Sequence, residues 1–122
     1  MPTQCSTMSE VVFRSLDHEA VMARLREHAE RELGRRAEVR EVVLIGSLAR
    51  GDWSARSDAD LVVLVDRAGE RPGLRGPDYA PSGKFPVSVD AFVYTPEEAD
   101  SWSPRFRAEV EHGQVLYRRP GA

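Results

Sequence analysis

The chain has 122 residues, of which 41% are hydrophobic and 30% charged, and its formal net charge is −3. This size and balance fit one folded globular domain and exclude a disordered chain, while the short apolar runs exclude a membrane-spanning helix. The only cysteine, Cys5, excludes a disulfide framework and a cysteine-based zinc site. The acidic balance disfavours binding to long nucleic acid, and the polar start lacks a signal-peptide pattern, which predicts a cytoplasmic protein.

An amphipathic helix is the first element that the sequence predicts, after a flexible leader at residues 1–10. Between residues 16 and 36, apolar side chains recur every four positions, which places them on one face of a helix. These residues are Val21, Leu25, Ala29 and Leu33. Gly34 then offers a C-terminal stop, so the helix is expected to end near this residue.

Three strands are expected after this helix. The β-branched run 39–45 is the first, and it ends at Gly46-Ser47, which a short helical turn at 48–50 follows. The second strand, 60–65, is apolar on both faces and is therefore expected in the centre of the sheet. Residues 67–84 are rich in Gly, Pro and Arg, which predicts a long loop, and residues 86–94 alternate as a third strand.

Two short helices and a last strand complete the predicted order. Thr95-Pro96 and Ser103-Pro104 each combine a capping residue with a proline at the first helical position. Gly113 is expected to end the second of these helices, and residues 115–117 suit a final short strand. This order predicts an α/β (α+β) fold, in which a small mixed β-sheet is flanked by helices.

The turn at Gly46-Ser47 has the chemistry of a phosphate cradle. Glycine has no Cβ, so its backbone can approach a ligand closely. Ser47 opens a short helix, and the free N–H groups at a helix N-terminus favour anionic phosphate oxygens. A Gly-Ser pair alone is more often an ordinary turn, so this interpretation depends on the residues that follow.

Three aspartates are expected to meet beside this turn. Asp58 and Asp60 are two residues apart where the second strand begins, so alternation places both side chains on one face. Asp90 lies on the third strand, on the face opposite to its apolar residues. If the two strands are neighbours, three carboxylates converge, and they repel one another unless cations lie between them. Carboxylates arranged in this way suit two Mg²⁺ ions.

The combined pattern resembles a known family. Gly46-Ser47, ten further residues, Asp58-Ala59-Asp60 and a later strand with Asp90 are similar to the signature of the DNA polymerase β nucleotidyltransferase superfamily. The string GSLARGDWSARSDADLVVLV, residues 46–65, resembles the minimal nucleotidyltransferases that are often paired with a HEPN-domain protein. The likeness is tight over residues 42–66 and looser elsewhere.

This resemblance implies a nucleotidyltransferase fold for residues 11–118. It implies that Gly46 and Ser47 hold the phosphates of ATP or another NTP, and Arg50 and Ser57 are further candidates for nucleotide binding. The three aspartates would bind two Mg²⁺ ions and carry the catalysis, with Asp90 helping to deprotonate the acceptor hydroxyl. In related minimal proteins the role is that of an antitoxin, which transfers AMP onto a tyrosine of its HEPN-domain toxin.

Other interpretations stay open at this point. A non-enzymatic antitoxin that neutralises its partner by contact is one alternative, and a small-molecule nucleotidyltransferase of the antibiotic-modifying type is another. Both share the fold, and neither the base, the acceptor nor the oligomeric state can be read from the sequence. Arg50 equally suits the C-terminal end of a short helix. The three histidines have no metal-ligand spacing and are expected at the surface: His18, His28 and His112.

Overall fold

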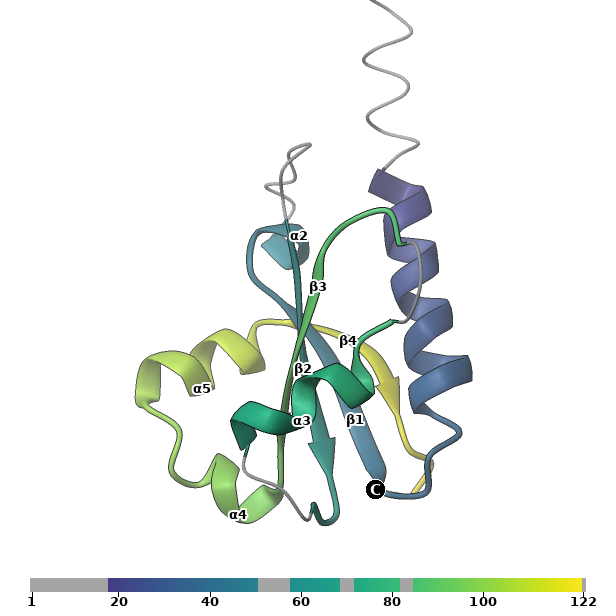
Figure 1. Ribbon diagram of the computed structural model, residues 1–122. Helices are drawn as coiled ribbons and strands as arrows, with labels where there is room; N and C mark the ends of the chain where they lie inside the picture. The colour runs from purple at the N-terminus through teal and green to yellow at the C-terminus, as the bar shows by residue number, and fades with distance from the viewer. Residues whose placement is uncertain (1–17, 51–57, 69–71, 82–84, 122) are drawn as a thin grey trace, which may run out of the picture.

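A four-stranded mixed β-sheet forms the centre of the protein (Figure 1). The computed structural model describes residues 18–50, 58–68, 72–81 and 85–121. The strand order is β3-β2-β1-β4, so β2 is central, as its apolar composition predicts. Strand β1 pairs antiparallel with β2 and β4, whereas β2 and β3 run parallel. The strands are β1 (Val39–Ile45), β2 (Ala59–Val65), β3 (Val89–Tyr94) and β4 (Gln114–Arg118).

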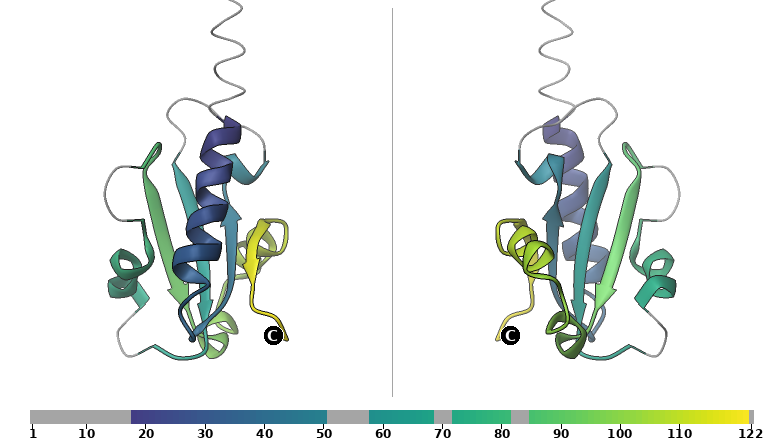
Figure 2. Two further views of the ribbon diagram at one scale, coloured as in Figure 1. Left: turned by 90° about the vertical axis from the view of Figure 1, so that its right-hand side faces the viewer. Right: turned by 90° about the vertical axis from the view of Figure 1, so that its left-hand side faces the viewer.

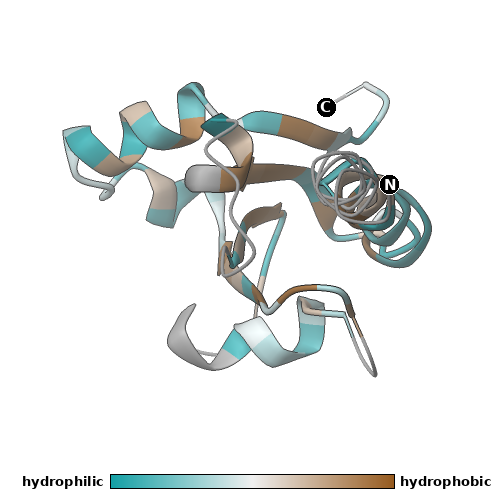
Figure 3. Cartoon of the chain, turned by 90° about the horizontal axis from the view of Figure 1, so that it is seen from above, coloured by the Kyte–Doolittle hydropathy of each residue, from teal (hydrophilic) through white to brown (hydrophobic). Residues whose placement is uncertain are grey.

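Helices cover both faces of this sheet. The N-terminal helix, residues 18–33, packs on one face, and α4 (Pro96–Ala99) and α5 (Pro104–Glu111) lie on the other (Figure 2). Viewed from above, apolar residues follow the strands in the centre of the molecule, and the outer side of the N-terminal helix is mainly hydrophilic (Figure 3). None of the described helices has the length and apolar character needed to cross a membrane. The predicted α+β fold is confirmed.

The N-terminal helix packs through the residues that its periodicity indicates. Residues 18–27 are α-helical, and η1 (His28–Leu33) continues them as a π-helix that ends at Gly34. The four predicted contact residues are all buried: Val21, Leu25, Ala29 and Leu33. The surface position expected for His28 is wrong, because its side chain is only 7% exposed. Its Nε2 lies 2.9 Å from the carbonyl oxygen of Tyr79, which gives the buried ring a polar partner.

Two hydrophobic clusters hold the helices on the sheet. The larger one lies under the N-terminal helix, where Leu25 and Leu33 pack with the inward residues of the strands. The smaller one lies under α5 and consists of Val43, Ile45 and Val62, on which an aromatic group packs. The rings of this group meet edge to face, with centroids 5.0 to 6.0 Å apart: Tyr94, Trp102 and Phe106. This packing fixes α5 over β1, and within the described part of the chain Asp90 and Phe92 remain exposed on the same sheet face.

The long loop predicted for residues 67–84 contains a helix, α3 (Pro72–Tyr79). Its sequence, PGLRGPDY, has poor intrinsic helix propensity, which explains why the local pattern predicts a loop. Tertiary packing against β3 outweighs this preference. A Cβ on Gly76 would lie 2.6 Å from the carbonyl oxygen of Ala91, so only glycine lets α3 approach the strand this closely.

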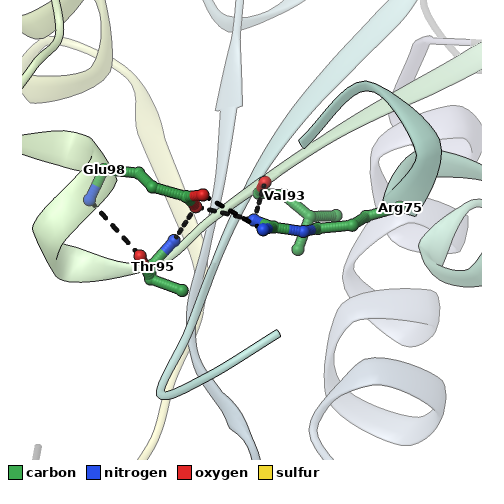
Figure 4. A network of polar contacts seen from close by, with 4 residues as sticks. All are labelled: Arg75, Val93, Thr95 and Glu98. Atoms are coloured by element: carbon green, nitrogen blue, oxygen red, sulfur yellow. Dashed lines mark hydrogen bonds and ion pairs between the residues drawn. The ribbon is translucent and has the colours of Figure 1, made fainter. Parts of the chain in front are cut away.

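A polar network fastens α3 to β3 and α4 (Figure 4). The Arg75 guanidinium donates to the carbonyl oxygen of Val93 at 3.2 Å and to both carboxylate oxygens of Glu98 at 2.6 and 3.0 Å. Glu98 also completes a capping box with Thr95 at the start of α4. Hydrogen bonds from the Arg75 guanidinium and, after it, from the Thr95 N–H lower the pKa of Glu98 to about 2. The network satisfies a carbonyl at the outer edge of β3 and restrains that edge.

The remaining boundaries agree closely with the sequence. Strand β1 has the expected limits, α2 (Ser47–Arg50) follows it, and β2 begins one residue earlier than predicted, at Ala59. Strand β3 begins at Val89 rather than at residue 86. The N-caps Thr95 and Ser103 both accept a hydrogen bond from the first turn of their helices, and a last strand follows Gly113.

Candidate functional site

Asp60 and Asp90 are brought together by the parallel pairing of β2 and β3. The register places Asp60 opposite Asp90, and neighbouring strands lie about 4.8 Å apart. Because Leu61 and Ala91 point into the larger core, the two aspartates share the other face of the sheet. Asp60 is half-buried and Asp90 is exposed. The sequence-based condition for their convergence, that these strands are neighbours, is therefore met.

The electrostatics of this face are unfavourable for a bare carboxylate. Burial raises the pKa of Asp60 above its ordinary value, and the nearby carboxylates of Asp90, Asp58 and Glu109 raise it further. Asp58 lies just before β2 and is exposed. Asp60 is thus the acid on which burial and the three neighbouring carboxylates act.

The Gly46 turn lies directly beside Asp60. Gly46 has a φ of +86°, a left-handed conformation that other residues adopt only with strain. A Cβ at this position would lie 3.2 Å from an Asp60 carboxylate oxygen, so a side chain here would crowd the carboxylate. The turn leads into α2, which buried Leu48 anchors to the core. Both the positive φ and the lack of space for a Cβ therefore favour glycine at position 46.

Helix α5 forms a second wall next to this turn. A surface pocket of about 470 Å³ extends from Gly46 and Arg50 to Arg105 and Glu109. Glu109 lies 3.7 Å from the Arg50 guanidinium, and both side chains are substantially exposed to solvent. The close packing of α5 depends on Gly113, because a Cβ there would lie 2.6 Å from a methyl group of Val43. Helix α5 thus contributes one acid, Glu109, and one arginine, Arg105, to the pocket beside Gly46.

Comparison with known proteins agrees with this arrangement. The family model of the nucleotidyltransferase domain matches residues 25–116. The chain belongs to this nucleotidyltransferase domain family. No curated protein matches its sequence significantly. A crystal structure of a protein from Sulfolobus solfataricus, described as "a putative nucleotidyltransferase", is similar with a TM-score of 0.59 and 19% identity over 87% of each chain. At this identity the likeness supports the fold, and the nucleotidyltransferase fold predicted for the chain is confirmed.

Membership in this family implies a transferase that uses an NTP, and such domains commonly use divalent metal ions. The carboxylates offer only oxygen ligands, which Mg²⁺ prefers. Among the described residues, no three His, Cys, Asp or Glu side chains converge as a ready-made ion site. Asp60 and Asp90 are partners in the register, and Mg²⁺ often takes one or two carboxylates together with substrate phosphates. The donor chemistry of the nucleotidyltransferase domain therefore fits this ion.

The sequence did not indicate Glu109 as a residue of this site. The nucleotide-binding roles expected for Ser47, Arg50 and Ser57 remain predictions. Glu109 belongs to no motif, and the only signal for it is its place one helical turn after Phe106, which packs on the sheet. Ser57 falls outside the described residues, as does the side chain of Ser47, although the backbone of Ser47 begins α2. Arg50 ends α2 and lines the pocket described above.

Proposed function

We propose that this nucleotidyltransferase domain transfers a nucleoside monophosphate from an NTP to an acceptor hydroxyl, with Asp58, Asp60 and Asp90 as the catalytic and metal-binding residues. The observation that carries this proposal is the pairing of Asp60 with Asp90 beside the Gly46 turn. A carboxylate pair on an open sheet face destabilises the free protein, and a bound metal-nucleotide would relieve the repulsion. A purely structural role of the two aspartates would not explain why the chain keeps a carboxylate pair that destabilises the free protein.

The reaction follows from the placement of these groups. The Gly46 turn and the start of α2 would bind the β and γ phosphates, with Arg50 and Ser57 as additional contacts. The acceptor oxygen attacks the α-phosphorus, the bond from that phosphorus to the bridging oxygen breaks, and pyrophosphate leaves. Asp90 would accept the proton of the acceptor hydroxyl. Two Mg²⁺ ions, held by the three aspartates, would supply charge neutralisation at the phosphates.

The acceptor is proposed to be a protein hydroxyl that approaches over β3. Phe92 follows Asp90 by two residues on the same face, and its side chain is 39% exposed. An exposed aromatic ring beside the proposed base favours an acceptor with an apolar contact surface. Taken with the resemblance to HEPN-paired minimal nucleotidyltransferases, this supports an antitoxin that transfers AMP from ATP to a HEPN-domain partner.

Nucleotide binding is the first test. Mg²⁺-loaded protein is titrated calorimetrically with non-hydrolysable analogues of ATP, GTP, CTP and UTP, alongside Asp60→Asn and the matched control Asp100→Asn. We expect Mg²⁺-dependent binding that is strongest for the ATP analogue, weakened at least tenfold by Asp60→Asn and unchanged by Asp100→Asn. If no analogue binds the wild-type protein, a non-enzymatic antitoxin becomes the better interpretation.

The acceptor is tested separately with ATP labelled at the α-phosphate. Label that moves onto a cognate HEPN-domain protein, and not with the Asp90→Asn variant, would support the protein-acceptor proposal. Label found only on a small hydroxylated molecule, such as an aminoglycoside, would instead support the antibiotic-modifying type.

A further inference from the structure

A second pocket lies on the side of the sheet opposite to Asp60 and Asp90. It has a volume of about 630 Å³ and lies between the C-terminal half of the N-terminal helix on one side and Asp78, Pro81 and Phe85 on the other. The N-terminal helix and α5 lie on opposite faces of the sheet, so this pocket is separate from the one beside Gly46 (Figure 2). Its size is in the range of small-molecule sites.

Four arginines line this pocket. Arg24 and Arg31 lie on the N-terminal helix, and Arg35 and Arg36 lie in the turn that follows it. None of the four has a carboxylate within ion-pair distance among the described residues, although the protein is acidic overall. Five other arginines do form ion pairs: Arg40, Arg50, Arg75, Arg118 and Arg119. Within the described part of the chain, the donor groups of Arg24, Arg31 and Arg35 are therefore not taken up by ion pairs.

Two of these guanidiniums are held in place by aromatic rings. The Arg36 guanidinium lies 4.5 Å from the centroid of the Tyr79 ring, and it also donates to the carbonyl oxygen of Asp78. The Arg24 guanidinium lies 5.1 Å from the centroid of Phe85. Such cation–π contacts fix a guanidinium without using its charge in an ion pair. Fixed donors lose less entropy when they bind an anion, which favours affinity.

The helix itself is irregular at this pocket. The π-helix η1 supplies His28 and Arg31 to the lining, and its wide turn closes with a hydrogen bond of 2.8 Å from the Gly34 N–H to the Ala29 carbonyl. Short π-helical segments are rare and occur frequently at functional sites. The buried ring of His28 binds the carbonyl of Tyr79 and so joins the two walls of the pocket.

From these observations we infer that this pocket binds a small phosphate-bearing molecule, independently of the proposed nucleotidyl transfer. Guanidiniums hold phosphate oxygens through paired hydrogen bonds. The carboxylates of Glu27, Glu32 and Asp78 also line the pocket, and they can accept hydrogen bonds from hydroxyl or amino groups of the same ligand. A phosphorylated molecule that carries such groups matches both kinds of lining residue.

Tripolyphosphate in the presence of EDTA is the probe for this inference. Without a divalent cation the carboxylates around Asp60 disfavour a polyphosphate at that face, and any binding that is weakened by substitutions in the arginine pocket is assigned to that pocket. The wild-type protein is compared by calorimetry with Arg31→Gln/Arg35→Gln, which leaves the ring-bound Arg24 and Arg36 in place. The control, Arg26→Gln/Arg67→Gln, removes the same charge from exposed positions outside the pocket.

We expect saturable binding to the wild-type protein and the control, and at least a tenfold weaker affinity for Arg31→Gln/Arg35→Gln at an unchanged melting temperature. Absence of saturable binding to the wild-type protein would overturn the inference. An equal loss in both variants would also overturn it, because binding would then follow net charge. Either result leaves the proposed transferase site untouched, since that site is tested with Mg²⁺.

Discussion

Asp60 on β2 and Asp90 on β3 are partners in a parallel ladder and share the open face of the sheet. Their register follows from the burial of Leu61 and Ala91 on the opposite face, so the core that stabilises the fold also forces two acids together. Burial and, after it, repulsion from the neighbouring carboxylates raise the pKa of Asp60, so its ionised form is disfavoured in the free protein. Substitutions of Asp60, Glu109 and Glu98 test the charge interactions of the site and its supports. A substitution of Gly76 tests the backbone packing of α3 on β3.

Asp60→Asn should stabilise the metal-free protein at neutral pH. The pKa of Asp60 is raised in the folded state, so the folded protein binds this proton more tightly than the unfolded chain does. The free energy of unfolding therefore falls as pH rises above the ordinary value of 3.8, and the ionised carboxylate destabilises the fold at pH 7.5. We expect a higher melting temperature for Asp60→Asn in EDTA at pH 7.5.

The difference in melting temperature between Asp60→Asn and the wild-type protein should shrink as the pH falls toward 3.8 and below, because the wild-type carboxyl becomes protonated. Mg²⁺ should raise the melting temperature of the wild-type protein more than that of Asp60→Asn. Asp100→Asn, at an exposed position in the turn after α4, serves as the control and should show neither effect. A lower melting temperature for Asp60→Asn at pH 7.5 would contradict the repulsion.

Glu109→Gln and Arg50→Gln should change nucleotide affinity in opposite directions. The Arg50–Glu109 pair is exposed and 3.7 Å long, so it contributes at most about 1 kcal/mol. Glu109 adds negative charge near Asp60, and it would compete with the proposed phosphate contact of Arg50. We expect Glu109→Gln to lower the Kd for Mg²⁺-ATP by a factor of about 2 to 5, the equivalent of such a weak pair.

Arg50→Gln should raise the same Kd, because a phosphate partner is lost. Glu111→Gln, on the same helix but exposed and outside the pocket, is the matched control and should leave the Kd unchanged. Weaker binding by Glu109→Gln would show instead that Glu109 orients Arg50 for the nucleotide.

Glu98→Gln should destabilise the protein through the loss of one ion pair. A glutamine at this position can still complete the capping box with Thr95, so the variant isolates the pair with Arg75. Arg75 is 8% exposed and Glu98 is 31% exposed. Leaving a buried charge without its partner costs about 3–5 kcal/mol, and the exposure of Glu98 reduces this, so we expect roughly 2 kcal/mol by urea unfolding at pH 7.

The contribution of Glu98 should depend on pH in the direction that its pKa sets. The folded-state pKa is about 2, below the ordinary 4.5, so the ionised form is favoured by folding. The stabilisation is fully present above pH 4.5 and is lost as the pH falls toward 2. The wild-type protein and Glu98→Gln should therefore converge in stability under acid, whereas exposed Glu97→Gln should match the wild type throughout.

Gly76→Ala should destabilise the protein although alanine is the better helix former. In an exposed helix this change stabilises by about 1 kcal/mol. Here the added Cβ would lie 2.6 Å from the carbonyl oxygen of Ala91, so α3 must move away from β3. Overpacking of this kind costs about 1–3 kcal/mol. A rise in the melting temperature would show that α3 does not depend on this contact.

Elements whose signals are local could be predicted from the amino-acid sequence. The β-branched run of β1, the four-residue period of the N-terminal helix and the capping residues Thr95 and Ser103 each specify their element within a few positions. The motif from Gly46 to Asp60 indicated the family for the same reason, since its glycine and its acids lie within one short segment.

Features that depend on residues far apart in the chain could not be predicted in this way, because they arise from tertiary contacts. Helix α3 forms from a poor helical sequence because Gly76 and Arg75 contact β3 and α4. The ring of His28 can be buried because its Nε2 forms a hydrogen bond with the carbonyl oxygen of Tyr79, 51 residues away. Glu109 acts on Asp60 because α5 folds back over β1. These contacts outweigh local propensity through burial and charge, and no window of sequence contains both partners.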